Sequence, residues 1–233
     1  MASRMALILA AVLVSTWYVE HWGVRQDFGE GGSKSAAPGI HDVSPSDMPG
    51  FRMTISRSVI DVNFAPGALE TPLSAVHHWI AASACAVTTY YGLVLPVKHL
   101  HLLIVPVEGQ RGVLGGRTQG YGGASTRIFV GQFATEEDLM RDWVMTHEMV
   151  HLAFPSVAEE HHWIEEGIAT YVEPIARVEA GNLEPRDVWH DLVEGLPRGL
   201  PQAGDQGLDR THTWGRTYWG GALFFTLADV RIR

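Results

Sequence analysis

The chain has 233 residues, of which 46% are hydrophobic and 18% charged, a balance typical of one globular domain with an extension. Its formal net charge of −9 argues against a nucleic-acid partner, because an acidic chain repels phosphates. A single cysteine, Cys85, excludes an internal disulfide.

Residues 1–22 predict a signal peptide or a membrane anchor. Arg4 precedes an apolar run from Met5 to Val14, which is short for a membrane-spanning helix and has the length of a signal-peptide core. We therefore expect the chain to be secreted, periplasmic or membrane-anchored facing outward, with any membrane association made through this segment. Residues 23–50 are rich in Gly, Ser, Pro and Asp and predict a flexible linker.

Residues 51–135 predict a β-rich part. Two apolar runs within Phe51–Phe64 indicate a hairpin, and Leu100–Val107 indicates a strand. Between them, Thr71–Tyr91 begins with a capping residue and a proline and then runs apolar, which predicts a long, mostly buried helix. Arg127–Val130 is expected to form an edge strand.

Residues 136–233 predict a helical part. Thr135 and Asp138 form a capping-box pattern, and a mainly helical apolar spacing continues until Pro155 stops the helix. We therefore expect one continuous helix from Thr135 to the residues just before Pro155.

That helix contains His147-Glu148-Met149-Val150-His151, which reads H-E-x-x-H. Two imidazoles one turn apart can bind one Zn²⁺, and Glu148 can act as general base on a zinc-activated water. A catalytic zinc site needs a third protein ligand. Phe154 and Val157 stand where the three-histidine class has a glycine and its third histidine, so that class is excluded.

The third ligand is expected from a second helix. Ile164, Ile168, Val172 and Ile175 recur at helical spacing and predict an apolar stripe, with Glu166 on another face. A glutamate from such a helix can complete a His-His-Glu set. The candidates in this stretch are Glu166, His161, His162 and Glu165.

Trp163-Ile164-Glu165-Glu166-Gly167-Ile168-Ala169-Thr170-Tyr171 resembles the W-[LI]-x-E-G-[FI]-[AT]-x-Y segment of gluzincin metallopeptidases, in the aminopeptidase N-like and glycyl-aminopeptidase-like families. The resemblance implies that Glu166 is the third zinc ligand, beside His147 and His151. It also implies a peptide or protein as substrate.

Tyr218-Trp219-Gly220-Gly221-Ala222 is similar to the Y-x-x-G-A segment of the same families. This similarity implies that the Tyr218 hydroxyl stabilises the oxyanion, a role suited to a phenol that donates a hydrogen bond to developing negative charge. His212 is the runner-up for this donor.

The chain departs from the aminopeptidases in one respect. Their G-x-M-E-N strand carries a glutamate that grips the free amino group of the substrate, and no acidic residue occurs in Gly120–Thr126. Exopeptidase or endopeptidase action is therefore left undecided. Thr170 also stands where some gluzincins place an acid that orients a zinc-bound histidine.

The order of elements fits an α+β zincin (thermolysin-like) fold, with a small mixed sheet followed by a helical part and the zinc site in the cleft between them. Glycyl-aminopeptidase-like proteins continue well past the Tyr218 segment, so the helical part is expected to be short or truncated. The leading hypothesis is a zinc metallopeptidase. The alternatives are a non-catalytic zinc-stabilised peptide-binding domain and a membrane-anchored structural domain without metal. The sequence predicts no oligomeric state.

Overall fold

A computed structural model describes residues 50–120 and 123–232. The predicted signal peptide or anchor lies outside these ranges, as does the predicted linker apart from Gly50. No helix within the described ranges is long and apolar enough to span a membrane. The described residues form a mixed α/β fold, with all strands in the first half and most of the helices in the second.

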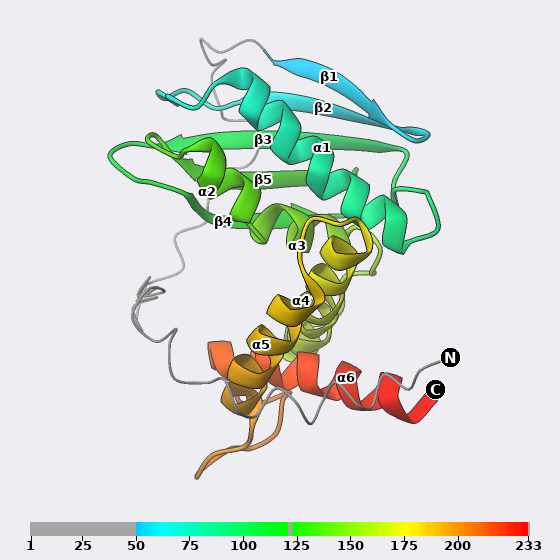
Figure 1. Ribbon diagram of the computed structural model, residues 1–233. Coiled ribbons are helices and arrows are strands. Elements are labelled where there is room, and N and C mark those ends of the chain that lie inside the picture. The colour runs from blue at the N-terminus through cyan, green and yellow to red at the C-terminus, as the bar shows by residue number, and fades with distance from the viewer. Residues whose placement is uncertain (1–49, 121–122, 233) are drawn as a thin grey trace. The chain divides into compact units, whose positions relative to one another are not determined.

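Five strands form one sheet in the order β1-β2-β3-β5-β4 (Figure 1). β1 and β2 are the predicted hairpin, β3 runs parallel to both β2 and β5, and β4 is antiparallel to β5. The strands are β1 (Phe51–Ile55), β2 (Ser58–Phe64), β3 (His99–Val107), β4 (Val113–Gln119) and β5 (Ser125–Gly131).

The prediction that Arg127–Val130 forms the edge strand is wrong. These residues belong to β5, which pairs with β3 on one side and β4 on the other. Among the described strands, the edge on this side of the sheet is β4, for which the sequence predicts no strand because Gly115 and Gly116 lower its β propensity. Gly115 has φ +152° and lies at an irregularity of the β4–β5 register, a backbone geometry that favours glycine.

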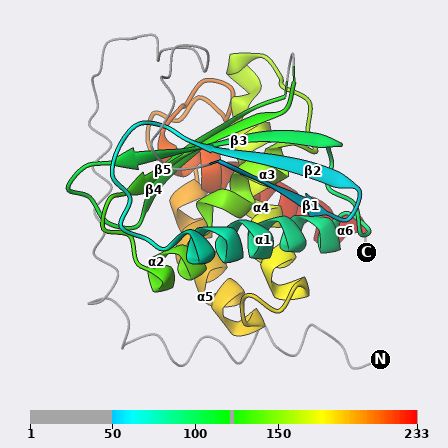
Figure 2. The ribbon, with the colours of Figure 1, turned by 90° about the horizontal axis from the view of Figure 1, so that it is seen from above.

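Helix α1 (Leu73–Tyr90) runs along one face of the sheet (Figure 2) and confirms the predicted long helix. Strand alternation directs Ile60, Leu102 and Ile128 into a core that also contains Trp79 of α1. Thr71 does not cap this helix, since its hydroxyl donates to the Ala134 carbonyl at 2.6 Å. The core thus lies on the face of the sheet that α1 covers.

The predicted continuous helix from Thr135 is wrong, although its start is correct. The Thr135 hydroxyl accepts from the Asp138 N–H at 3.1 Å, and the Asp138 carboxylate accepts from the Thr135 N–H at 2.8 Å, so the capping box is confirmed. The chain then divides into α2 (Glu136–Arg141) and α3 (Val144–His151), and only α3 carries H-E-x-x-H.

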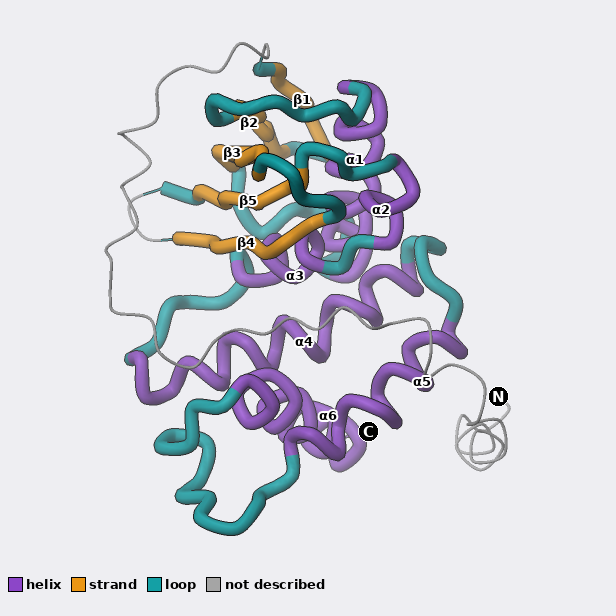
Figure 3. Tube along the Cα trace, turned by 90° about the vertical axis from the view of Figure 1, so that its left-hand side faces the viewer, coloured by secondary structure: helices purple, strands orange, loops and turns teal. Residues whose placement is uncertain are grey.

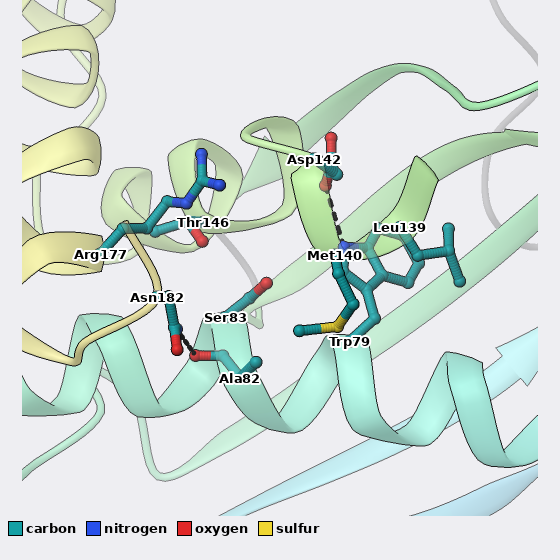
Figure 4. A pocket seen from close by; sticks show the side chains of 9 residues that line it. All are labelled: Trp79, Ala82, Ser83, Leu139, Met140, Asp142, Thr146, Arg177 and Asn182. Carbon is teal, nitrogen blue, oxygen red and sulfur yellow. Dashed lines mark hydrogen bonds between the residues drawn. The ribbon is translucent and has the colours of Figure 1, made fainter. Parts of the chain in front are cut away.

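Asp142 accounts for the break between α2 and α3. Its carboxylate accepts hydrogen bonds from the N–H groups of Val144 (2.8 Å) and Met145 (2.9 Å), which α3 itself leaves unpaired. The indole N–H of Trp79 in α1 donates to the same carboxylate at 3.0 Å (Figure 4). The adjoining cavity is only about 10 Å³, room for about one water, so this region fixes the start of α3 rather than binding a ligand.

The helical half lies beyond the β4 end of the sheet, where α4 packs against α1, α3 and α6 (Figure 3). Its elements are η4 (Glu159–His161), α4 (His162–Glu179), α5 (Pro185–Gly195), η5 (Leu196–Gly199), the π-helical turn η6 (Gly215–Gly220) and α6 (Gly221–Ile232). The helix expected after His161 is therefore confirmed as α4.

The predicted apolar stripe of α4 is only partly correct. Val172 is buried, but Ile164 and Ile168 are only half-buried, whereas Glu166 and Ala169 are buried. Helices α1, α3 and α6 all pack on α4, so its buried face is set by close helix packing and by the site rather than by one hydrophobic stripe.

Replacing Asp142 tests its role at the start of α3. Asp142→Ala leaves the two helix N–H groups and the Trp79 indole without their acceptor, so it is expected to lower the free energy of unfolding by about 1–3 kcal/mol. Asp142→Asn keeps one acceptor oxygen and is expected to cost less. Urea denaturation measures both, with the exposed Glu137→Ala as the control; equal stability of Asp142→Ala and wild type would contradict this role.

Candidate metal centre

Helix α3 brings two imidazoles together. His147 and His151 lie one turn apart, and their Nε2 atoms are 3.2 Å from one another. The rings meet edge to face, with centroids 4.9 Å apart. His147 is buried and His151 half-buried, so the pair lies at the margin of the core.

Glu166 of α4 is the third group. Its Oε2 lies 3.0 Å from the Nε2 of His147 and 3.6 Å from the Nε2 of His151. One ligand atom from each of the three residues falls within 4.8 Å of the other two. Ligands bound to a tetrahedral zinc at about 2.0–2.1 Å are about 3.4 Å apart, so the spacing and the two-nitrogen, one-oxygen set both fit Zn²⁺.

The charges of Glu166 and His147 also suit a metal. Burial opposes the charge of Glu166, but hydrogen bonds from His147, His151 and His162 outweigh it and lower the pKa of that carboxyl well below its ordinary value. Burial lowers the pKa of His147 and favours its neutral ring. An ionised carboxylate and a neutral imidazole are the forms that bind metal.

The other proposed third ligands do not join this cluster. His161 places its Nδ1 3.0 Å from Asp209, and Glu165 accepts from the Val157 N–H. His162 reaches the opposite oxygen of Glu166, with 3.0 Å between its Nε2 and Oε1. It can therefore hold the carboxylate in place while the other oxygen faces the two histidines.

Glu148 lies beside the centre and is buried. Burial raises the pKa of this carboxyl to about 7, a value suited to accepting and returning a proton near neutral pH. The edge strand β4 lies directly against it: a Cβ on Gly116 would come 2.5 Å from Cγ of Glu148. Thr118 of the same strand donates to the Glu148 carbonyl at 2.9 Å.

The sequence does not single out Gly116 as a site residue. A glycine within a strand often marks a close approach of another group to the backbone. Because the sequence does not predict this strand, that signal cannot be recognised. Any side chain at this position would displace Glu148 or Ile128. The absence of a side chain at Gly116 thus allows β4 to pack directly against Glu148, the candidate general base.

Tyr218 in η6 lies over the centre. Its ring stacks on His147 with centroids 5.8 Å apart, and Trp214 stacks on it at 5.7 Å. Burial, followed by the nearby Glu166 charge, raises the pKa of the Tyr218 phenol, so the hydroxyl keeps its proton and can donate it in a hydrogen bond. His212, the runner-up donor, is exposed on the loop before η6.

Two glycines allow Tyr218 to lie close to the His-His-Glu cluster. A Cβ on Gly167 of α4 would lie 2.4 Å from the Cα of Gly221, where α6 begins. Helices α4 and α6 therefore approach backbone to backbone, immediately next to Glu166 and three residues after Tyr218. The W-x-E-E-G and Y-x-x-G-A segments contain these two glycines, so the two segments pack directly against one another.

Aromatic rings flank His147, whose Nε2 faces Glu166. Within the described residues, its buried Nδ1 has no hydrogen-bond partner. The Trp143 ring meets His147 edge-on, with 5.3 Å between centroids, while Tyr218 stacks on the imidazole. Thr170, which stands where some gluzincins have an orienting acid, also leaves its buried hydroxyl without a partner among these residues.

Comparison with known proteins finds structural neighbours only. No family model and no curated protein matches the chain. An aminopeptidase N family protein from Idiomarina loihiensis matches with a TM-score of 0.47 and 12% identity over 66% of this chain and 29% of that protein. An M1 zinc metallopeptidase from Deinococcus radiodurans matches with a TM-score of 0.45 and 17% identity, over 78% and 39%.

The chain thus spans less than two-fifths of the length of these solved structures. The neighbours are aminopeptidase N-family zinc metallopeptidases at low identity and partial coverage. At these values the similarity assigns neither a family nor an activity.

Replacing Glu166 separates it from its neighbour Glu165. Glu166→Gln removes the only carboxylate of the cluster and is expected to weaken zinc binding by at least about tenfold, since even loss of a group that supports a ligand costs that much. Glu165→Gln should leave zinc affinity close to wild type. Competition with a fluorescent zinc chelator measures both; a larger loss in Glu165→Gln would reverse the assignment.

Proposed function

We propose that this chain is a zinc-dependent peptidase of the gluzincin type, in which His147, His151 and Glu166 hold the metal. One observation carries the proposal: a compact His-His-Glu cluster lies beside a buried glutamate whose pKa is about 7. A metal site that only stabilised the fold would be closed by four ligands and would need no such base.

Zinc, when bound, supplies a Lewis acid that activates water and polarises the scissile carbonyl. Glu148 accepts the proton of the attacking water and passes it to the leaving amine, a role that its raised pKa favours. Tyr218 keeps its phenolic proton and donates a hydrogen bond to the oxyanion. His162 holds the far oxygen of Glu166, so that the carboxylate presents one oxygen to the metal.

The proposed substrate is an extended peptide bound along β4. This strand is at the edge of the described sheet and contacts Glu148 through Gly116. The side on which no described strand pairs with it offers backbone groups close to the general base. The proposed arrangement is the zincin one, with the sheet and the helical half on either side of α3. Endopeptidase and exopeptidase action both remain within the proposal.

Glu148→Gln tests the general base. The amide keeps the shape of the side chain but cannot accept the proton, so hydrolysis of a peptide library should fall about 10²–10⁴-fold while zinc content stays at wild-type level. Mass spectrometry of the digest and metal analysis of the same sample give both values. Undiminished turnover would refute this mechanism, and a zinc-loaded wild type that cleaves nothing would favour the non-catalytic peptide-binding domain.

Tyr218→Phe tests the oxyanion donor. The variant keeps the stacking on His147 but loses the hydroxyl, so kcat should fall about 10²–10³-fold with little change in KM. Tyr91→Phe, at the far end of α1, is the matched control and should behave as wild type. Steady-state kinetics on a peptide that the library identifies would measure the split; an unchanged kcat would remove Tyr218 from the mechanism.

A further inference from the structure

A second group of metal-binding side chains lies on the face of the sheet away from α1. β2 and β3 run parallel with Asp61 directly opposite His101, and His99 precedes His101 by two residues on the same strand. Because side chains alternate along a strand, all three project to one face, while Ile60 and Leu100 project into the core. Figure 3 shows α1 and α2 on the core side of the sheet, with no described helix on the opposite side.

We propose that Asp61, His99 and His101 form a second binding site for a divalent transition-metal ion of the zinc type. One ligand atom from each residue lies within 4.8 Å of the other two. His99 Nε2 is 2.6 Å from Asp61 Oδ2, and the two imidazole centroids are 4.4 Å apart. His99 and His101 are exposed, so their side chains have room to rotate toward the spacing of about 3.4 Å that zinc requires.

The donor set selects the class of ion. Two imidazoles and one carboxylate suit Zn²⁺, Cu²⁺ or Ni²⁺, whereas Ca²⁺ and Mg²⁺ prefer oxygen ligands. Three protein ligands leave a coordination position open to solvent or to another molecule. The Asp61 site is more exposed than the His147 site. An ion at the Asp61 site is therefore expected to bind more weakly and to exchange more readily.

Arg52 prepares the carboxylate of this site. Its guanidinium donates to both carboxylate oxygens, at 2.5 Å from Nε to Oδ1 and at 3.2 Å from Nη2 to Oδ2. Oδ2 also lies 2.6 Å from Nε2 of His99. Hydrogen bonds from Arg52 and then His99 lower the pKa of Asp61 to about 2, so the carboxylate is ionised at neutral pH. The shorter Arg52 bond, to Oδ1, can persist when Oδ2 takes a metal, as bonds from partners of metal-bound carboxylates do.

A purely electrostatic role accounts for only part of the cluster. An exposed Arg52–Asp61–His99 ion pair needs no metal, and such pairs contribute little to stability. It gives no role to His101, whose ring lies beside His99 and directly opposite Asp61 in the register. A metal site uses all three residues.

Zinc stoichiometry tests the second site. The full chain, stripped with a chelator and dialysed to equilibrium against micromolar free Zn²⁺, should bind two zinc ions per molecule. His101→Ala and Asp61→Asn should each bind one. His78→Ala changes an exposed histidine elsewhere and should still bind two. Thermal melting of each variant confirms that the chain is folded.

A fourth variant, which combines His147→Ala with His151→Ala, distinguishes zinc bound at the second site from zinc bound at the first. It should retain one zinc ion, which disappears when His101→Ala is added; this result supports the second site even if the first fails. The proposal is overturned if His101→Ala and Asp61→Asn bind as much zinc as His78→Ala. It is also overturned if wild type binds a single zinc ion and only the His147→Ala, His151→Ala variant fails to bind it.

Discussion

The buried charge of Glu166 is the constraint on which the centre depends. A carboxylate this deep in a protein is costly unless it is paired, because an isolated buried ion carries a penalty of several kcal/mol. Its partners are His147 and His151 on α3 and His162 one turn before it on α4. Compensation of one charge thus ties the two helices together, and the same arrangement supplies a metal with two nitrogens and one oxygen.

The surrounding structure places these side chains by separate local devices. Asp142 starts α3 at a fixed residue and links that start to Trp79 of α1, which fixes where His147 follows along the helix. Gly116 allows β4 to lie against Glu148, and the contact between Gly167 and Gly221 lets η6 carry Tyr218 over the centre. Each of these contacts contributes little to the free energy of folding, but together they determine which groups face one another.

The parts of the site that the sequence predicts are those with local signals. A four-residue spacing places His147 and His151 on one helix face, and the box of Thr135 and Asp138 marks a helix start. Glu166 follows from a resemblance, and the structure brings it to the histidines. The break before α3 is missed because the Asp142 cap competes with helical periodicity that continues across it.

Local sequence signals do not determine the order of the strands in the sheet. The sequence does not predict that β4 is the edge strand, because its glycines hide the strand and pairing with β5 depends on distant contacts. The Asp61–His101 partnership is missed for the same reason, since it exists only in the parallel register of β2 and β3.

The central claim is that His147, His151 and Glu166 bind zinc together. Anomalous diffraction at the zinc edge from crystals of the zinc-loaded chain tests it most directly. The account predicts a peak about 2.0–2.2 Å from Nε2 of each histidine and from one oxygen of Glu166. A zinc ion bound instead through His161 or Glu165, or no peak between α3 and α4, would contradict it.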